Sequence, residues 1–407
     1  MLMFVFCCAK KSYITGRFKA KYCYFCSIIT CQMEKQQLSG KSLTELQHIM
    51  EELGQPRFVA GQVTRWLYQK QIFSFDEMTN VSKNVRRLLD EKFTLGRQRP
   101  VSEAVSKDGT VKYLYQTDDG HYVETVYIPE RDRATLCVSS QVGCKMGCKF
   151  CMTGTLGFHG QLPASEILNQ ILYFPLTSDN PKQSNNKPST SALSSPPLGG
   201  LGGVSPLTNI VYMGEGEPMD NLDNVLRSLQ VMTSAWGCAW SPKRITVSSV
   251  GVVPGLKRYI EECDCHLAIS LHNPFSTERQ AVMPIEKAYH LTDVVALLKQ
   301  YDWQHQRRVS FEYICWGGVN DTPKHANELL RLLRGLDCRI NLIRFHAGVE
   351  EVSHKADQVT FPASNERHME WLRDYLTAHG LTTTIRRSRG EDILAACGML
   401  VNALKQQ

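Results

Sequence analysis

The chain has 407 residues, of which 43% are hydrophobic, enough for one large domain with its own core and a smaller second domain. No run of about 18 apolar residues occurs, so the sequence predicts no membrane-spanning helix. Fifteen cysteines would be many unpaired thiols for an oxidising compartment, and the chain is too long for a disulfide scaffold, so we expect a cytoplasmic protein. The net charge of +6 permits RNA binding without requiring it.

The first 33 residues differ in composition from the rest of the chain. They hold five cysteines among lysines and aromatic residues and show neither a helical nor a strand period. Ordinary composition begins at Met33. We therefore expect translation to start there, and residues 1–33 to be a leader without a part in the function.

Residues 34–100 predict a small helical domain. A capping box from Ser42 to Glu45 opens a first helix that ends near Gly54. A second helix is expected over residues 58–71. A third, basic helix passes through Arg86, Arg87 and Lys92. From the residues alone, this domain is equally a packing appendage or a docking surface for RNA; the family resemblance described below favours docking of RNA.

The remainder of the chain predicts an α/β domain. Residues 101–130 alternate around Asp118-Asp-Gly120 and predict a β-hairpin that connects two domains. From residue 131 to 385, β-rich runs alternate with helical patterns. The strands are expected near residues 135–139, 208–213, 244–249, 265–271, 308–314 and 338–344. The helices are expected near residues 164–174, 221–235, 254–262, 290–301, 322–335 and 364–379. Six such units indicate a parallel sheet with right-handed connections.

Residues 177–206 interrupt this alternation. They are rich in Asn, Ser, Pro and Gly, a composition that cannot bury enough apolar surface to offset the entropy of ordering. We expect a flexible surface insertion without a catalytic part. Residues 386–407 are expected to form a separate C-terminal tail.

The most specific chemical signal is a short loop with three cysteines, Cys144, Cys148 and Cys151. Gly143 and Gly147 let such a loop wrap tightly around a metal centre. Three thiolates do not complete a tetrahedral zinc site unless a fourth ligand comes from far away. A 4Fe-4S cluster bound by three thiolates keeps one iron open for a small molecule, and we favour this interpretation over three buried structural thiols.

This CxxxCxxC loop, which follows a predicted strand, resembles that of the radical S-adenosylmethionine (radical SAM) enzymes. The segments from Arg133 to Cys144 and from Arg389 to Gly398 narrow the resemblance to the RlmN/Cfr family of RNA adenine methyltransferases, and within it to the RlmN type. The likeness runs from about Leu43 to the C-terminus without the insertion. It implies a partial (β/α)6 radical SAM barrel with the site at the C-terminal ends of the strands.

The resemblance also implies a SAM-binding site at turns and strand ends. The implied contacts are Gly216, Glu217, Ser248, Ser270, Leu271 and His272. Taken alone, each of these residues would be a plain turn or a satisfied strand-end residue. One position departs from the family pattern, because many relatives have an Asn where this chain has His346. An imidazole can still donate or accept a hydrogen bond there.

Two further cysteines acquire roles only through the resemblance. It implies that Cys397 takes a methyl group from SAM and that Cys137 later breaks the covalent link between Cys397 and RNA. Glu124 matches a position assigned to proton acceptance, although Cys137 could take the same proton. Without the resemblance, two structural thiols and a solvated Glu would be the plainer interpretation. The remaining thiols of the barrel are expected to be structural, namely Cys238, Cys263, Cys265, Cys315 and Cys338.

The implied reaction explains why the family needs a cluster, two molecules of SAM and two cysteines. C2 of adenine is electrophilic, so a polar methyl transfer from SAM fails there. In the family, one SAM methylates the cysteine, and a second SAM, split by an electron from the cluster, activates that methyl group for addition to C2. The reaction leaves a Cys137–Cys397 disulfide that a cellular thiol must reduce. An electron donor for the cluster is also implied, and we expect a monomer.

The implied substrates are an adenosine of 23S rRNA and the adenosine beside the tRNA anticodon, each unstacked for the reaction. Two alternatives stay open. A Cfr-like enzyme would methylate adenine C8, and the helical N-terminal segment favours the RlmN type over it. An RNA-binding protein with a purely structural cluster would not cleave SAM and would leave the segment around Cys397 unexplained.

Overall fold

The computed structural model describes residues 35–173, 207–303, 307–346, 362–396 and 398–400. The expected leader, the expected insertion and Cys397 lie outside the described residues. Contacts divide the chain into Met1–Lys35 and Gln36–Gln407, and the described helices and strands belong to the second unit. In the described ranges, no helix is long and apolar enough to cross a membrane.

The first helix of the N-terminal segment begins where its capping box predicts it. α1 (Leu43–Glu52) begins after Ser42, whose hydroxyl accepts a hydrogen bond from Glu45 N while the Glu45 carboxylate accepts one from Ser42 N. The expected second helix is α2 (Val59–Thr64), which continues into a π-helical turn, η1 (Arg65–Lys70). The segment is completed by β1 (Gln36–Gln37), η2 (Phe75–Glu77), α3 (Lys83–Lys92) and β2 (Phe93–Thr94). β1 and β2 pair in parallel and join the two ends of this segment.

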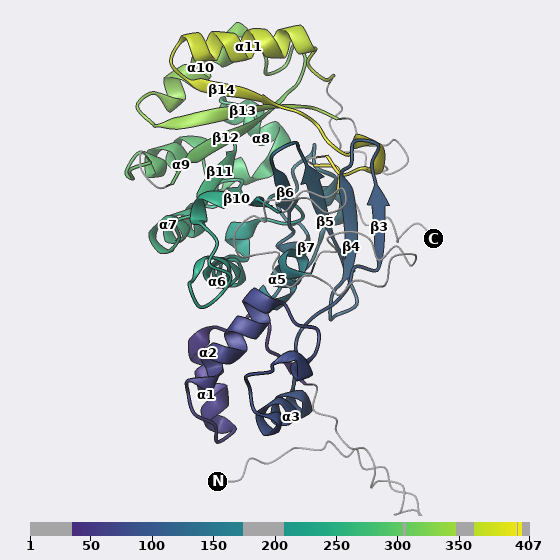
Figure 1. The fold of residues 1–407 in the computed structure, drawn as a ribbon. Coiled ribbons are helices and arrows are strands. Elements are labelled where there is room, and N and C mark those ends of the chain that lie inside the picture. Colours follow the sequence, from purple (N-terminus) through teal and green to yellow (C-terminus); the bar gives the residue numbers. More distant parts are fainter. Residues whose placement is uncertain (1–34, 174–206, 304–306, 347–361, 397, 401–407) are drawn as a thin grey trace, which may run out of the picture. The chain divides into compact units, whose positions relative to one another are not determined.

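A sheet of ten strands organises the rest, in the order β14-β13-β12-β11-β10-β9-β6-β5-β4-β3 (Figure 1). The antiparallel strands are β3 (Ser102–Val105), β4 (Val111–Gln116) and β5 (Tyr122–Pro129). The parallel strands are β6 (Ala134–Cys137), β9 (Asn209–Tyr212), β10 (Ile245–Ser249), β11 (His266–Ser270), β12 (Val309–Cys315), β13 (Cys338–Arg344) and β14 (Thr382–Arg386). The expected α/β architecture with a parallel sheet is confirmed.

Helices follow the parallel strands and pack beside one another along one face of the sheet (Figure 1). They are α5 (Ala164–Leu172), α6 (Leu222–Thr233), α7 (Val253–Glu262), α9 (Leu291–Leu298), α10 (Pro323–Leu333) and α11 (Glu366–Ala378). A further helix, α8 (Ser276–Val282), follows β11 but is not part of this row, because its Val282 packs in a separate apolar cluster with Cys148 and Ile314. Short 3-10 turns occur at η3 (Pro218–Asp220), η4 (Pro242–Arg244), η5 (Pro284–Lys287) and η7 (Glu391–Ile393). Val247, Leu267 and Phe311 are buried in the core with these helices. Because side chains alternate along a strand, their sequence neighbours point to the opposite face, which we call the inner face.

Two parts of the sheet differ from the expectation. Residues 101–130 form three strands rather than a two-stranded connection, and β5 pairs with β6, so this segment extends the barrel sheet. β14 was not expected as a strand. Its sequence, Thr-Thr-Thr-Ile-Arg, lacks an apolar run because it lies at the edge of the sheet, where pairing with β13 rather than burial on both faces stabilises it.

Candidate active site

The loop with three cysteines is held by a small hairpin. β7 (Gln141–Gly143) precedes the loop, α4 (Met152–Leu156) ends it, and β8 (Phe158–Gln161) pairs back with β7. Gly143 has a φ of +69°, and a Cβ there would lie 1.9 Å from Gly157 O. The hairpin therefore closes only with glycine at position 143, which fixes the point where the cysteine loop begins.

The three cysteines line one cavity together with most of the residues expected to bind SAM. Its walls include Cys144, Cys148, Cys151, Gly216, Glu217, Ser248, Ser270 and His272. These residues come from the cysteine loop and from the C-terminal ends of β9, β10 and β11. We call this the cluster cavity. The structure therefore brings together residues that are more than a hundred positions apart in the sequence.

The donor set of the cluster cavity fits an iron-sulfur cluster. Burial raises the pKa of Cys144 to about 12 and raises the pKa values of Cys148 and Cys151 as well, so the thiolates need a cation beside them. Among the described residues, no three Cys, His, Asp or Glu side chains converge on one metal ion. A 4Fe-4S cluster does not need such convergence, because each thiolate binds a different iron.

The turn after β9 approaches its neighbours too closely for side chains. A Cβ on Gly214 would lie 2.8 Å from Val138 O, and a Cβ on Gly216 would lie 2.5 Å from the Gln141 side chain. Gly216 also has a φ of +100°. These two glycines therefore let the backbone of the turn lie against β6 and β7.

The two acidic residues of this turn bind different segments. Glu217 accepts hydrogen bonds from Met219 N at 3.0 Å and Val250 N at 2.8 Å, and burial raises the pKa of Glu217 to about 7. Glu215, to which no sequence pattern gave a role, accepts from Glu124 N at 2.9 Å and Gly143 N at 3.2 Å. Burial and the nearby Glu124 raise the pKa of Glu215 to about 8. The Gly-Glu-Gly-Glu sequence of residues 214–217 is the pattern from which a role for Glu215 beside Glu217 could have been predicted.

The ends of β10 and β11 form the next wall of the cavity. Ser248 and Ser270 face it directly, whereas the Leu271 side chain is fully buried in the core and leaves only its backbone for a ligand. His272 has a φ of +55°, and its Nδ1 accepts a hydrogen bond from Ile314 N at 3.1 Å. Burial, aided by the charge of Arg279, lowers the pKa of His272 to about 3, so this ring is neutral.

Arg279 on α8 holds these strand ends together. Its guanidinium donates to the carbonyl oxygens of Val250 and Ser270, both at 2.9 Å, and to Leu271 O at 3.1 Å. Glu286, which is also buried, forms an ion pair with it. No sequence pattern pointed to Arg279, because it lies in a short helix without a motif. Its position is visible only once the ends of β10 and β11 are adjacent.

We expect Arg279→Met to weaken SAM binding by at least about tenfold, because the three carbonyl groups at the strand ends lose their common donor. The free energy of unfolding should fall by about 3–5 kcal/mol, because the buried Glu286 carboxylate loses its partner. Denaturant unfolding and equilibrium binding of SAM to reconstituted protein measure the two effects. Arg258→Met, which removes an exposed ion pair between Arg258 and Glu262, is the control and should change neither. Normal SAM affinity in Arg279→Met would contradict this role.

Cys137 and the chain on both sides of Cys397 lie close together. The Cys137 side chain is part of a small apolar cluster that includes Val126, Ala395 and Leu400. Cys397 itself lies outside the described residues, but Gly398 O accepts a hydrogen bond from Met152 N at 2.8 Å, directly after the cysteine loop. The described residues of the tail therefore contact both Cys137 and the wall of the cluster cavity.

The turn between β3 and β4 holds this tail in place. Asp392 accepts hydrogen bonds from Ser106 Oγ at 2.6 Å and from Lys107 N at 3.1 Å. In the opposite direction, Asp108 accepts from Gly390 N at 3.0 Å. The three added strands at the edge of the sheet thus position the segment that leads to Cys397.

Glu124 lies on the inner face beside Cys137. Val126 pairs with Cys137 across β5 and β6, and Glu124, two residues before Val126, therefore points to the same face. Its carboxylate is buried and lies 3.0 Å from Lys112 Nζ. Lys112 also donates to Leu394 O at 3.4 Å, which links this ion pair to the tail.

His346 is placed differently from the other expected SAM contacts. Its Nε2 lies 2.5 Å from Ser388 Oγ and its Nδ1 lies 3.6 Å from Glu391. It lines a neighbouring, larger pocket and does not line the cluster cavity. A contact between His346 and SAM stays a prediction.

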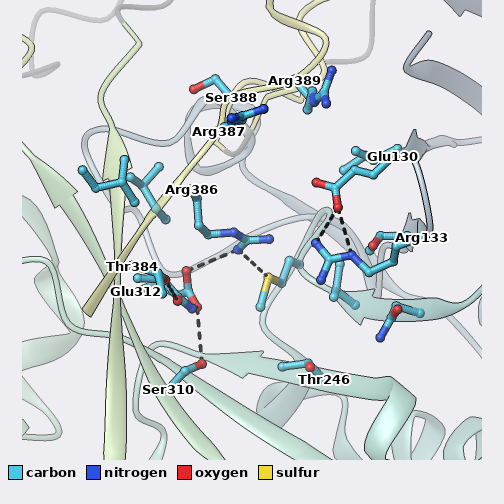
Figure 2. A pocket seen from close by; sticks show the side chains of 18 of the residues that line it. Glu130, Arg133, Thr246, Ser310, Glu312, Thr384, Arg386, Arg387, Ser388 and Arg389 are labelled. Atoms are coloured by element: carbon cyan, nitrogen blue, oxygen red, sulfur yellow. Dashed lines mark hydrogen bonds and ion pairs between the residues drawn. The ribbon is translucent and has the colours of Figure 1, made fainter. Parts of the chain in front are cut away.

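Glu312 and Arg386, which form an ion pair in the larger pocket (Figure 2), line the cluster cavity as well. Arg386 Nη1 lies 3.3 Å from the Glu312 carboxylate and 3.7 Å from Met213 Sδ. The other Glu312 oxygen accepts from Asn341 Nδ2 at 2.7 Å. No sequence pattern assigned a role to Glu312. It lies on the inner face with Ser270 because the two residues are paired across β11 and β12.

Comparisons with known proteins agree over nearly the whole chain. Residues 36–95 match the family model of the ribosomal RNA large subunit methyltransferase N-terminal domain. The chain is 53% identical over 375 residues to a probable dual-specificity RNA methyltransferase RlmN of Bacteroides fragilis, covering 92% of this chain and 99% of that protein. It is 38% identical over 373 residues to the dual-specificity RNA methyltransferase RlmN of Desulfotalea psychrophila, covering 91% and 96%. The crystal structure of a radical SAM methyltransferase from Sphaerobacter thermophilus matches with a TM-score of 0.76 at 34% identity, covering 89% and 98%.

Proposed function

The chain belongs to the RlmN family of radical SAM RNA methyltransferases, and from this premise we propose that it methylates C2 of adenosine in 23S rRNA and in tRNA beside the anticodon. One observation carries the proposal. The cysteine loop, the glycine turn after β9, Cys137 and the segments that flank Cys397 gather around the inner face of one sheet. An RNA-binding protein with a structural cluster would not need this arrangement.

In this proposal, Cys144, Cys148 and Cys151 hold a 4Fe-4S cluster. The backbone around Gly216 and Leu271, with the side chains of Glu217, Ser248, Ser270 and His272, holds SAM in the same cavity. When bound, the cluster and SAM together supply an electron, a methyl group and a hydrogen-abstracting radical. Arg279 keeps two walls of the cavity in register through three carbonyl oxygens.

The two remaining cysteines divide the covalent chemistry. The Cys397 thiolate would attack the methyl carbon of SAM and displace S-adenosylhomocysteine. Once the radical supplied by a second SAM had removed a hydrogen atom from that methyl group, its carbon could bond to C2 of the adenine, and the resulting adduct would give up one electron to the oxidised cluster. After C2 has lost its proton, the Cys137 thiolate attacks the Cys397 sulfur, a sulfur–sulfur bond forms, the carbon–sulfur bond to RNA breaks, and the released carbon takes up a proton. Either Glu124 or Cys137 accepts the C2 proton, since both are on the inner face. The apolar cluster around Cys137 excludes water from this step.

The proposal includes partners that the chain does not supply. A one-electron donor must reduce the cluster, and a cellular thiol must reduce the Cys137–Cys397 disulfide, which places the reaction in the cytoplasm. We assign the helical segment of residues 36–95 to docking of RNA by a monomeric enzyme. Its basic helix α3 carries Arg86, Arg87 and Lys92.

Mass spectrometry of 23S rRNA and tRNA, from cells with and without the gene, tests this function. We expect 2-methyladenosine to be lost from both RNAs when the gene is deleted and to return with the intact gene. Loss of 8-methyladenosine would instead assign the Cfr-type reaction. No change in either nucleoside would contradict the proposal.

A further inference from the structure

A large pocket begins at the N-terminal ends of the parallel strands, the ends away from the cluster cavity, and extends along the inner face to Arg387, Ser388 and Arg389 after β14. It encloses about 1030 Å³ and is drawn in Figure 2. Asn209, Thr246, His266, Ser310, Arg339 and Thr384, each among the first three residues of a parallel strand, line it. We call this pocket the basic basin. Because the N-terminal ends of parallel strands share one edge, these side chains form a continuous rim.

The basic basin and the cluster cavity occupy two ends of the same inner face. Thr246 pairs with His266 across β10 and β11, and Ser310 pairs with Arg339 across β12 and β13, so these side chains share a face. Ser248 and Glu312 lie two residues further along their strands, in the cluster cavity. Met213, Glu312, Ile343 and Arg386 line both spaces, which makes them neighbours without an intervening layer.

The lining of the basic basin is strongly cationic. Eight Lys and Arg side chains and three carboxylates are among its described residues. Two of the carboxylates are already engaged, Glu130 by Arg133 and Glu312 by Arg386. Within the described ranges, Lys243, Arg308 and Arg339 form no ion pair, although they lie near one another at the starts of β10, β12 and β13. Burial and these three cations lower the pKa of His266 to about 4, so the ring between them is neutral.

Unpaired cations that converge on one pocket repel one another, and a bound anion relieves that repulsion. The other side of the basic basin is formed by Ala395 and Ala396, which directly precede Cys397. A molecule that fills the basin can therefore contact both the cations at the rim and the residues that precede Cys397. A nucleic-acid strand fits this arrangement, because it carries a phosphate at every nucleotide and its bases can reach further along the inner face.

We propose that the basic basin binds backbone phosphates of the RNA next to the target adenosine, so that RNA approaches from the N-terminal ends of the strands while SAM occupies the C-terminal ends. This inference rests on the proposed function, because it takes RNA as the substrate. Lys243, Arg308 and Arg339 are the residues that bind phosphate. They position the strand and carry no sequence preference.

The test compares two triple variants with the same change in net charge. The basin variant is Lys243→Gln, Arg308→Gln and Arg339→Gln. The control variant is Arg244→Gln, Lys257→Gln and Arg334→Gln, whose residues do not line the basin. Binding of an unmodified anticodon stem-loop RNA to full-length, cluster-loaded protein is measured by fluorescence anisotropy at several salt concentrations.

We expect the basin variant to bind this RNA at least about tenfold more weakly than the unaltered protein. The slope of log affinity against log salt should fall by about 0.7 for each phosphate that the protein no longer neutralises, hence by about 2 in the triple variant. The control variant should stay within about twofold of the unaltered protein. Lys243→Arg with Arg308→Lys and Arg339→Lys, which keeps the charges, should restore most of the affinity.

SAM cleavage without RNA separates this inference from the proposed function. Both Gln variants should cleave SAM at the unaltered rate, since none of the residues that they replace lines the cluster cavity. Equal RNA affinity and salt slope in the basin and control variants would overturn the basin assignment while RNA methylation continued. If the charge-keeping variant also failed to bind RNA while folded, the assignment of these residues to phosphate binding would likewise be wrong. Failure of the unaltered protein to methylate RNA would instead count against the proposed function.

Discussion

A Cys137→Ala protein is expected to accumulate as a covalent conjugate with its RNA substrate. Cys397 is still present, so it takes the methyl group and adds to the adenine, but no thiol remains to attack its sulfur and release the product. Turnover should fall by a factor of at least about 10⁴, as for other covalent catalysts that lose an essential group. The conjugate is measured as a slow band on a denaturing gel that disappears after ribonuclease treatment.

Cys397→Ala is the decisive comparison for this prediction. It should form no conjugate and carry no S-methyl group, because the nucleophile is missing. Cys265→Ala removes a fully buried thiol from the core that contains Val247 and Leu267. It controls for the loss of a thiol elsewhere in the protein and should form no more conjugate than the unaltered protein. Absence of a conjugate in Cys137→Ala, or repeated turnover by Cys397→Ala, would show that the two cysteines do not divide the work in this way.

Replacing Cys148 by Ala is expected to abolish both iron loading and SAM cleavage. Cys148 is buried at the centre of the cysteine loop and lines the cluster cavity, so its loss would remove one of the three proposed ligands of the cluster. Anaerobically reconstituted protein should hold about four irons per chain, and the variant should hold few or none. Iron analysis, the electron paramagnetic resonance spectrum of the reduced protein and release of 5′-deoxyadenosine measure the effect.

Cys144→Ala and Cys151→Ala should behave like Cys148→Ala, whereas Cys338→Ala should not. Cys338 is half-buried on β13 and lines neither the cluster cavity nor the basic basin. It therefore controls for a general loss of stability on removing a thiol. Normal iron content and SAM cleavage in Cys148→Ala would rule out the ligand set.

Local sequence signals predicted most of the elements because each depends on nearby residues. The capping box at Ser42 and Glu45 determines where α1 begins, and it forms as expected. The alternation of β-rich runs and helical patterns predicted the α/β fold for the same reason, and the family resemblance to RlmN is confirmed by the relatives. Strands at the edge of the sheet are harder to predict from the sequence. β14 is stabilised by pairing with β13, an interaction between distant residues that no local pattern reveals.

The type of chemistry is evident from the sequence, since three cysteines at close spacing and two flanking motifs lie in short, continuous segments. Which distant residues line the same cavity depends on the folded domain. Arg279 gained a role because the ends of β10 and β11 are adjacent, and Glu312 because strand register turns it toward Arg386. The basic basin likewise exists because parallel strands bring their first residues, among them His266 and Arg339, to one edge. Proximity of this kind follows from strand pairing across the whole domain, which a linear pattern does not encode.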